Sequence, residues 1–227
     1  PPSRENVKGY IRGFDVRTGE RRWIFHTIPT AGEYGRDTWL SDSAVYTGNT
    51  GVWTNMTVDA ELGLAYLPVE IPTGDYYGGH RPGDNLFGES LVAVDIETGE
   101  RRWHFQYTPN DSWDYDEVGV HMLYDLTIDG QLRKIVAHYG RNGFFYSLDR
   151  TNGSFIGGMQ YVNELTWTAG LNSETGKPLE YDPNLDIQIY NEEARALRAD
   201  RDEMKRACPT WHGGVAHQPL AYNPVKN

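Results

Sequence analysis

One segment of the sequence occurs twice and limits the folds open to this chain. Residues 13–23 read GFDVRTGERRW, and residues 93–103 read AVDIETGERRW. Weaker copies of the same turn lie at residues 58–63 and 148–153. The turn aspartates recur at intervals close to the ~40–50 residues that one blade of a β-propeller occupies; they are Asp15, Asp59, Asp95 and Asp149. The repeat predicts an array of similar units that forms one domain over residues 1–227.

Each unit reads as a strand, a turn and a second strand. In the stronger copy, residues 91–94 are β-rich, Asp95 can accept hydrogen bonds from turn amides, and Gly99 supplies a left-handed backbone position. Trp103 and Phe105 follow two residues apart and share a face, so the indole can pack against the next unit. The content of 13% aromatic residues and 25 glycines agrees with many short strands joined by tight turns.

We therefore predict an all-β fold, a β-propeller of tryptophan-docking blades. The four turns indicate about four partial or complete blades, too few to close a ring. The alternative is a pair of similar hairpins without the ring architecture.

Residues 190–206 are the stretch that predicts a helix. The segment is rich in Ala, Leu, Glu and Arg, and Asp202 and Arg206 stand at i, i+4 spacing. Because apolar positions are sparse, we expect a helical surface insertion within the propeller domain. The alternative is a docking helix for a redox partner.

Charge and motif content exclude several classes of protein. A formal net charge of −11 gives no positive field that would attract nucleic acid or anionic lipid. The sequence has no long apolar run for a transmembrane helix, no signal-peptide pattern, and one cysteine, Cys208. It also lacks the motifs for covalent haem, for a phosphate-binding loop and for a serine nucleophile, and the spacing of His212 and His217 is a weak zinc signal.

Three aspartates crowd into residues 111–116, beside Trp113. If residues 113–116 are extended, Asp114 and Asp116 point to the same side of the strand. Two like charges so close raise one another's pKa unless a cation lies between them, which favours a hard metal ion with oxygen ligands. The alternative is an acidic turn with solvated carboxylates.

Arg141 and Trp53 are candidates for binding a ligand. Arg141 stands between the β-rich runs 134–137 and 144–148 with glycines on either side, so its guanidinium could hold a carbonyl or carboxylate oxygen. The alternative is a turn arginine in water. Trp53 could be a stacking floor for a planar ligand or an ordinary core aromatic.

The repeated turn and a set of further motifs resemble the pyrroloquinoline quinone (PQQ)-dependent alcohol, methanol and glucose dehydrogenases. The similarity covers nearly the whole chain in the family's order. The further motifs lie at residues 32–39 (GEYGRDTW), 81–85 (RPGDN), 113–116 (WDYD), 140–143 (GRNG), 166–170 (TWTAG), 175–178 (TGKP), 207–209 (ACP) and 221–224 (AYNP).

This resemblance implies an eight-bladed propeller with PQQ and a calcium or lanthanide ion near its axis, working in the periplasm. It also implies an alcohol or sugar substrate, a cytochrome or quinone electron acceptor, and blades of a parent chain beyond this segment. Residues 76–80 (YYGGH) hint at a sugar-oxidising relative. We expect the 227 residues alone to be inactive.

The resemblance also assigns roles to single residues. It places Asp114 at the catalytic-base position, Arg141 at the PQQ-contacting arginine and Trp53 near the tryptophan on which the quinone rests. Asp116 matches an extra metal-binding aspartate of lanthanide-dependent methanol dehydrogenases. The implied mechanism makes Arg141 catalytic as well, because the metal and Arg141 polarise the quinone carbonyl while Asp114 takes the hydroxyl proton and hydride leaves the carbinol carbon for PQQ. Gly213 and Gly214 match cofactor-binding positions.

The chain departs from the family pattern at several positions. Ile71 stands where the family has an Asn metal ligand, so the neighbouring Glu70 becomes a candidate ligand. Residues 215–217 read VAH where the family has Lys-Asn-Trp, which puts Ala216 in place of an amide. The family also implies a disulfide partner for Cys208 beyond this segment. These departures keep a second hypothesis open, a non-catalytic PQQ-like propeller that acts as a scaffold or assembly protein.

Overall fold

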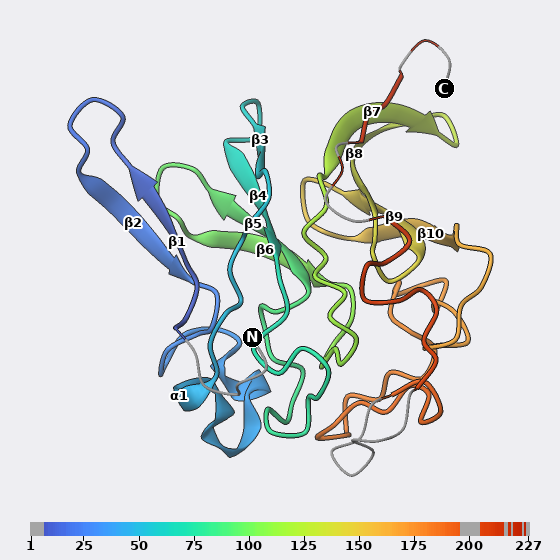
Figure 1. Ribbon diagram of the computed structural model, residues 1–227. Helices are drawn as coiled ribbons and strands as arrows, with labels where there is room; N and C mark the ends of the chain where they lie inside the picture. Colours follow the sequence, from blue (N-terminus) through green and yellow to red (C-terminus); the bar gives the residue numbers. More distant parts are fainter. Residues whose placement is uncertain (1–6, 196–204, 216–217, 219, 224, 226–227) are drawn as a thin grey trace.

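A computed structural model describes residues 7–195, 205–215, 218, 220–223 and 225. Within them the strands form three antiparallel sheets that lie side by side (Figure 1). The first sheet has two strands, β1 (Tyr10–Phe14) and β2 (Arg21–His26). The second has four, β3 (Thr57–Asp59), β4 (Leu64–Val69), β5 (Ser90–Asp95) and β6 (Arg101–Gln106). The third also has four, β7 (Met122–Ile128), β8 (Gln131–Tyr139), β9 (Phe144–Asp149) and β10 (Phe155–Gln160).

The propeller prediction is confirmed, with a different assignment of turns to blades. Each four-stranded sheet is paired in chain order, and β3 lies against β7, so the first strands of neighbouring blades come together. The turns at Asp59 and Asp95 belong to the same sheet, one between β3 and β4 and one between β5 and β6. The described residues therefore hold two complete blades and one two-stranded sheet, because a single antiparallel blade contains more than one such turn.

The described helices are short and lie between β2 and β3. They are the 3-10 turns η1 (Arg36–Thr38) and η2 (Leu40–Asp42) and the helix α1 (Ser43–Tyr46). The helix expected over residues 190–206 falls mostly on residues 196–204, which lie outside the described residues, and residues 190–195 form bends and turns. Among the residues that the structure describes, no helix is long and apolar enough to cross a membrane.

The tryptophans of the repeat join each sheet to the next, as predicted. Trp23 on β2 donates its indole N–H to the carbonyl of Ile96 (3.0 Å) and covers Gly99 in the turn between β5 and β6. Trp103 on β6 makes the equivalent contact one blade later, with the carbonyl of Arg150 (3.1 Å) and with Gly153. A glycine is needed in each turn because the indole lies where a Cβ would stand.

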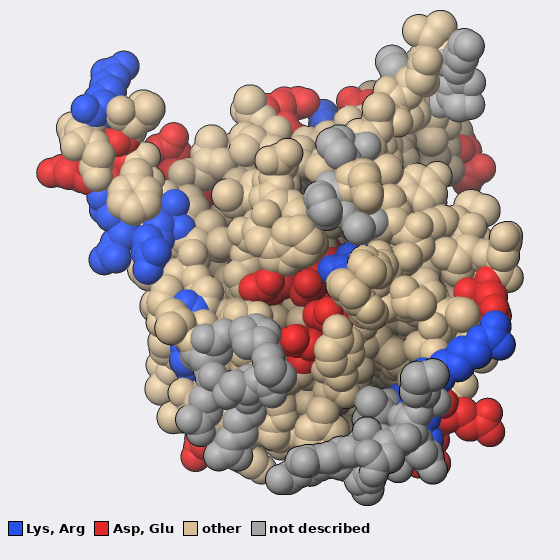
Figure 2. Space-filling model, in the orientation of Figure 1, with Lys and Arg blue, Asp and Glu red and all other residues tan. Residues whose placement is uncertain are grey.

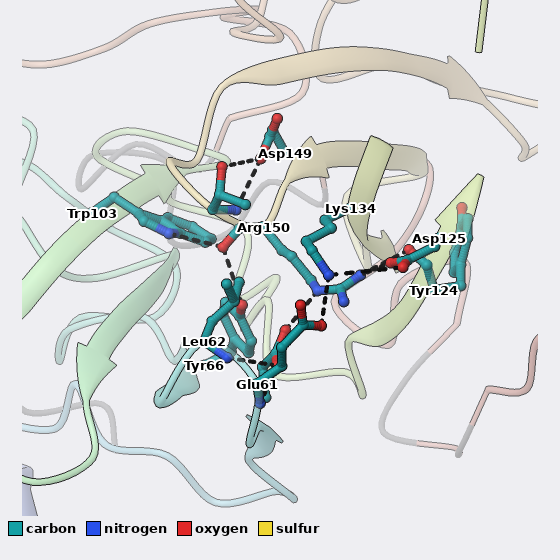
Figure 3. Close-up of polar contacts among 11 residues, drawn as sticks. Glu61, Leu62, Tyr66, Trp103, Tyr124, Asp125, Lys134, Asp149 and Arg150 are labelled. Atoms are coloured by element: carbon teal, nitrogen blue, oxygen red, sulfur yellow. Dashed lines mark hydrogen bonds and ion pairs between the residues drawn. The ribbon is translucent and has the colours of Figure 1, made fainter. Parts of the chain in front are cut away.

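Arg150 is the polar centre of the junction between the two complete blades (Figure 3). Its Nε donates to Asp59 Oδ2 (2.6 Å) and its Nη1 to Asp125 Oδ1 (2.5 Å), so one guanidinium pairs with a carboxylate from each sheet. Its own carbonyl accepts hydrogen bonds from Tyr66 Oη and Trp103 Nε1, both at 3.1 Å. Together these bonds hold the two blades in a fixed position relative to each other.

Candidate functional site

Three connections leave the two complete blades at the same end. In the second sheet Val69 pairs with Ser90, and Ser90 pairs with Gln106. The connections 70–89 and 107–121 therefore both start at the same end of its strands. In the third sheet Met122 pairs with Ala137, which brings the turn 140–143 to the corresponding edge. Figure 2 shows a hollow near the middle of one face, with Asp and Glu atoms at its floor and Lys or Arg atoms beside them.

The three connections meet around Asp114 and Asp116. Asp116 Oδ2 forms an ion pair with Arg141 Nη1 (3.1 Å), and its Oδ1 accepts from the backbone N–H of Ile71 (3.0 Å). Tyr76 donates its hydroxyl to Asp114 Oδ2 (3.2 Å). The structure therefore brings together residues predicted separately from the WDYD and GRNG motifs.

The backbone of residues 113–116 is not extended, which corrects the basis of one prediction. Asp114 (φ 61°) and Asp116 (φ 43°) both lie in the left-handed region. The Asp111 carboxylate imposes this fold, because it accepts the N–H groups of Trp113 and Tyr115, each at 3.0 Å. Trp113 and Tyr115 stack in the core with ring centroids 6.0 Å apart. The aromatic and acidic side chains therefore still alternate, and Asp114 and Asp116 point away from the core.

Burial and mutual repulsion raise the pKa values of these acids. Burial raises the pKa of Asp114 to about 7, with further increases from the charges of Asp116 and Asp75. Burial also raises the pKa of Asp116 to about 6, against the opposing effect of Arg141. The pKa of Glu70 is raised by burial, and its Oε1 accepts from the Gly51 amide (2.8 Å). The site is therefore a cluster of carboxyl groups whose protonated forms are favoured by burial and neighbouring charges, with the pKa of Asp114 closest to neutral pH.

The predicted metal ligands do not converge. Within the part of the chain that the structure describes, no three His, Cys, Asp or Glu side chains lie close enough to hold a metal ion. Asp116 forms an ion pair with Arg141, and the Glu70 carboxylate accepts a hydrogen bond from the Gly51 amide. Asp114, Asp116 and Glu70 supply oxygen donors, but their geometry does not fit a complete coordination sphere.

Arg141 is buried and not a solvated turn arginine. Its side chain has an exposed fraction of 6%, and its Nη2 donates to the carbonyl of Trp211. Its Nε is buried and has no hydrogen-bond partner within the described residues. The guanidinium thus keeps one donor for a further acceptor.

Trp53 is not a core aromatic. Its exposed fraction is 48%, and it lies in the irregular segment before β3. A half-exposed indole contradicts the core interpretation and is compatible with the stacking interpretation.

Gly213 and Gly214 pack against Arg141. Gly213 is left-handed (φ 73°), and a Cβ there would stand 2.5 Å from the Cβ of Arg141. The Gly214 amide donates to the Arg141 carbonyl (3.1 Å). Ala216 and His217 lie outside the described residues, and Cys208 carries a partly buried free thiol.

Two buried polar residues beside the acidic loop, Arg81 and Glu89, were not predicted as parts of the site. Arg81 is fully buried, donates to Asn85 Oδ1 (2.9 Å) and to the carbonyl of Asp111, and so holds the start of the acidic loop. Glu89 is buried, and both its carboxyl oxygens have no hydrogen-bond partner among the described residues. Burial raises its pKa well above the usual range, with further increases from the charges of Asp111, Glu117 and Asp116. The RPGDN motif pointed to Arg81, whereas no local pattern marks Glu89.

Comparison with known proteins gives consistent matches. Residues 2–164 match the family "PQQ: Glucose/ethanol/alcohol dehydrogenase, beta-propeller domain". A quinohemoprotein alcohol dehydrogenase of Pseudomonas putida is 34% identical over 96% of this chain and 30% of its own length. The dehydrogenase subunit of a quinone alcohol dehydrogenase of Komagataeibacter europaeus is 38% identical over 86% of this chain and 28% of its own length.

Solved structures agree. The structure of quinohemoprotein alcohol dehydrogenase ADHIIG from Pseudomonas putida superposes with a TM-score of 0.84 at 32% identity, over 98% of this chain and 32% of that one. A europium-containing methanol dehydrogenase superposes with a TM-score of 0.81 at 28% identity, over 98% of this chain and 39% of that one. The chain thus spans about a third of the length of the relatives it matches.

Proposed function

Because this chain belongs to the β-propeller family of PQQ-dependent glucose, ethanol and alcohol dehydrogenases, we propose that it forms part of a longer dehydrogenase that oxidises a primary alcohol or an aldose sugar. The observation that carries the proposal is the meeting of Asp114, Asp116 and Arg141 from two blades in one acidic site. A propeller used only as a scaffold has no need for buried acids with raised pKa values beside a buried arginine.

Arg141 and Trp53 are the residues of this chain that would hold PQQ. The unpartnered Nε of Arg141 supports this role, because a guanidinium binds carbonyl and carboxylate oxygens with directed N–H groups. Trp53 is half-exposed, and an indole is a side chain on which a flat tricyclic ring can stack. PQQ, when bound, supplies the quinone that accepts the hydride.

Asp114 is the general base in this proposal. It accepts the proton of the substrate hydroxyl, and its pKa of about 7 supports this role, since a base is most effective when its pKa lies near the working pH. Its side chain is only partly buried, whereas Asp116 is paired with Arg141. Tyr76 donates to the same carboxylate and thereby orients it.

A calcium or lanthanide ion is the second group that we propose for the full-length protein. The carboxylate oxygens of Asp114 and Glu70 are the donor type that a hard cation takes, and the similarity to a europium-containing methanol dehydrogenase supports the proposal. Because Asp114, Asp116 and Glu70 do not converge in the described residues, they cannot hold the ion together, and most of its ligands would come from outside those residues.

The surroundings of the enzyme are further proposals. We place it in the periplasm, with a cytochrome or quinone as its electron acceptor, by the resemblance noted above. The names of the alcohol-oxidising relatives favour an alcohol over a sugar as substrate. Activity requires the other blades, so the 227 residues alone would be inactive.

The test is dye reduction by the full-length protein. We expect reduction with an alcohol only after PQQ and calcium or lanthanum have been added. Asp114→Asn should abolish turnover while PQQ, followed by its absorbance, still binds. Turnover that survives in Asp114→Asn removes Asp114 as the base. Failure of the wild-type protein to bind PQQ under all metal conditions would favour the scaffold hypothesis.

A further inference from the structure

Glu117 connects the acidic loop to the turn that carries Arg141. It follows Asp116 directly and is completely buried. Its Oε2 lies 2.8 Å from His138 Nε2, in a hydrogen bond, and accepts from the backbone N–H of Arg141 (3.0 Å). Its Oε1 accepts from the backbone N–H of Asn142 (3.0 Å). One carboxyl group therefore binds two successive amides of the turn and one imidazole.

The turn is packed tightly onto this carboxyl group. A Cβ at Gly140 would stand 2.8 Å from Glu117 Oε2, so the backbone approaches the acid as closely as a glycine allows. On the opposite side, the Arg141 carbonyl accepts from Gly214 (3.1 Å). The backbone of Arg141 is thus held from both sides, and its guanidinium extends to Asp116.

His138 is itself held in place. It has an exposed fraction of 1% and stacks on His121 with ring centroids 4.2 Å apart and an interplanar angle of 10°. His121 Nε2 is 2.9 Å from the hydroxyl of Tyr107, which is also buried. The orientation of the Glu117 carboxyl group is therefore determined by a line of buried polar rings and not by solvent.

From this geometry we infer that Glu117 is a positioning residue that sets the place of the Arg141 guanidinium beside the acidic site, and through it the affinity for the oxygen atoms of the bound quinone. The inference rests on the proposed function, since the ligand of Arg141 is taken from it. Glu117 itself is buried, and its hydrogen bonds within the described residues go to His138, Arg141 and Asn142.

Glu117→Gln in the full-length protein tests this role. The carboxamide keeps the shape, but its NH2 group must face an N–H donor of the turn, which loosens the hold on Arg141 or Asn142. We expect the dissociation constant for PQQ to rise at least about tenfold, as for loss of a hydrogen bond to a charged group. Glu180→Gln is the matched control, because Glu180 also accepts hydrogen bonds, from Thr168 Oγ1 and from the Ala169 amide, and neither partner belongs to the turn that carries Arg141.

A double-mutant cycle separates positioning from general damage. In an Arg141→Ala background, we expect Glu117→Gln to weaken PQQ binding by less than about twofold, because the group it positions is gone. His138→Gln, which keeps an N–H donor, should bind PQQ like the wild type. An equal tenfold effect of Glu117→Gln with and without Arg141 overturns the inference.

A second readout does not depend on PQQ. The rate at which phenylglyoxal modifies Arg141 in the cofactor-free protein, measured by peptide mass spectrometry, should rise at least about tenfold in Glu117→Gln and stay unchanged in Glu180→Gln. If Glu117→Gln does not fold, His138→Met removes one donor and should raise the same rate. Equal rates in the wild type and the variant refute the positioning role, whereas a raised rate without PQQ binding by the wild type refutes only the proposed function.

Discussion

Gly99→Ala should destabilise the protein far more than Gly19→Ala, although the two glycines occupy the same turn. Both are followed by Glu-Arg-Arg-Trp, both are left-handed (φ 73° and 74°), and both amides donate to the backbone carbonyl of the turn aspartate at 2.8 Å. They differ in one respect. A Cβ at Gly99 would stand 2.5 Å from the Trp23 ring, whereas a Cβ at Gly19 meets nothing within 4 Å.

The expected magnitudes follow from this difference. An alanine forced into the left-handed region costs roughly 1–2 kcal/mol, and this cost applies to both variants. At position 99 the methyl group must also displace a docked indole, and overpacking of this kind costs about 1–3 kcal/mol more. Gly99→Ala should therefore lower the free energy of unfolding by about 2–5 kcal/mol, and Gly19→Ala by about 1–2 kcal/mol.

Equilibrium urea unfolding, followed by tryptophan fluorescence and far-UV circular dichroism, measures both variants. The indole of Trp23 reports on the junction, because its N–H bonds to the Ile96 carbonyl in the turn of the next blade. The spectrum of Gly99→Ala should shift toward that of an exposed indole before global unfolding. If the two variants lose the same stability, the tryptophan contact does not hold the blades together and the glycine serves the turn alone.

Two further predictions concern buried polar groups. Arg150→Met should lower the free energy of unfolding by about 3 kcal/mol in urea titrations, because it leaves the Asp59 carboxylate buried without its cation. Lys134→Met, which removes the more exposed ion pair with Glu61, should leave the unfolding midpoint close to that of the wild type. Equal losses of stability in the two variants would contradict this account. Burial lowers the pKa of His138 to about 3 and the pKa of His121 well below the usual range, because the folded interior disfavours a charged imidazole. The contribution of each neutral imidazole to the free energy of unfolding is therefore complete above the unfolded pKa of about 6.5. It is lost as the pH falls from about 6.5 toward 3, because only the unfolded state takes up the proton. His138→Gln should reduce the loss of stability between pH 6.5 and 4.5 by about 1.4 kcal/mol per pH unit, and an unchanged slope in thermal melts would show that His138 is not buried neutral.

The parts of the site that could be predicted are those whose chemistry is local. Asp114 and Asp116 were found because three acids and a tryptophan crowd into one short segment, and Arg141 because glycines flank it between two strands. The prediction that Asp114 and Asp116 point to one side assumed an extended backbone, whereas both residues are left-handed in the structure. The Asp111 side chain bends this segment by binding two of its amides, and strand periodicity does not reveal such a bond.

The support of the site could not be predicted, because it depends on contacts between distant segments. Glu117 reads in the sequence as one more acid of an acidic run, and His138 as the end of a strand. Only the packing of the third blade against the loop after β6 brings Glu117 Oε2 and His138 Nε2 to 2.8 Å in the buried interior. Arg150 is similar, since its two carboxylate partners come from different sheets.

The amino-acid sequence by itself determined the blade, because the strand, the aspartate-capped turn, the glycine and the docking tryptophan all act within about ten residues or against the next copy of the same unit. Tertiary structure decided how turns group into blades and which buried donor faces which acid. It also decided that Asp116 binds Arg141 and does not join Asp114 and Glu70 around a common point. The physical reason is range: turn and strand preferences come from adjacent residues, whereas burial, ion pairing and the pKa values they produce come from whatever the fold places alongside.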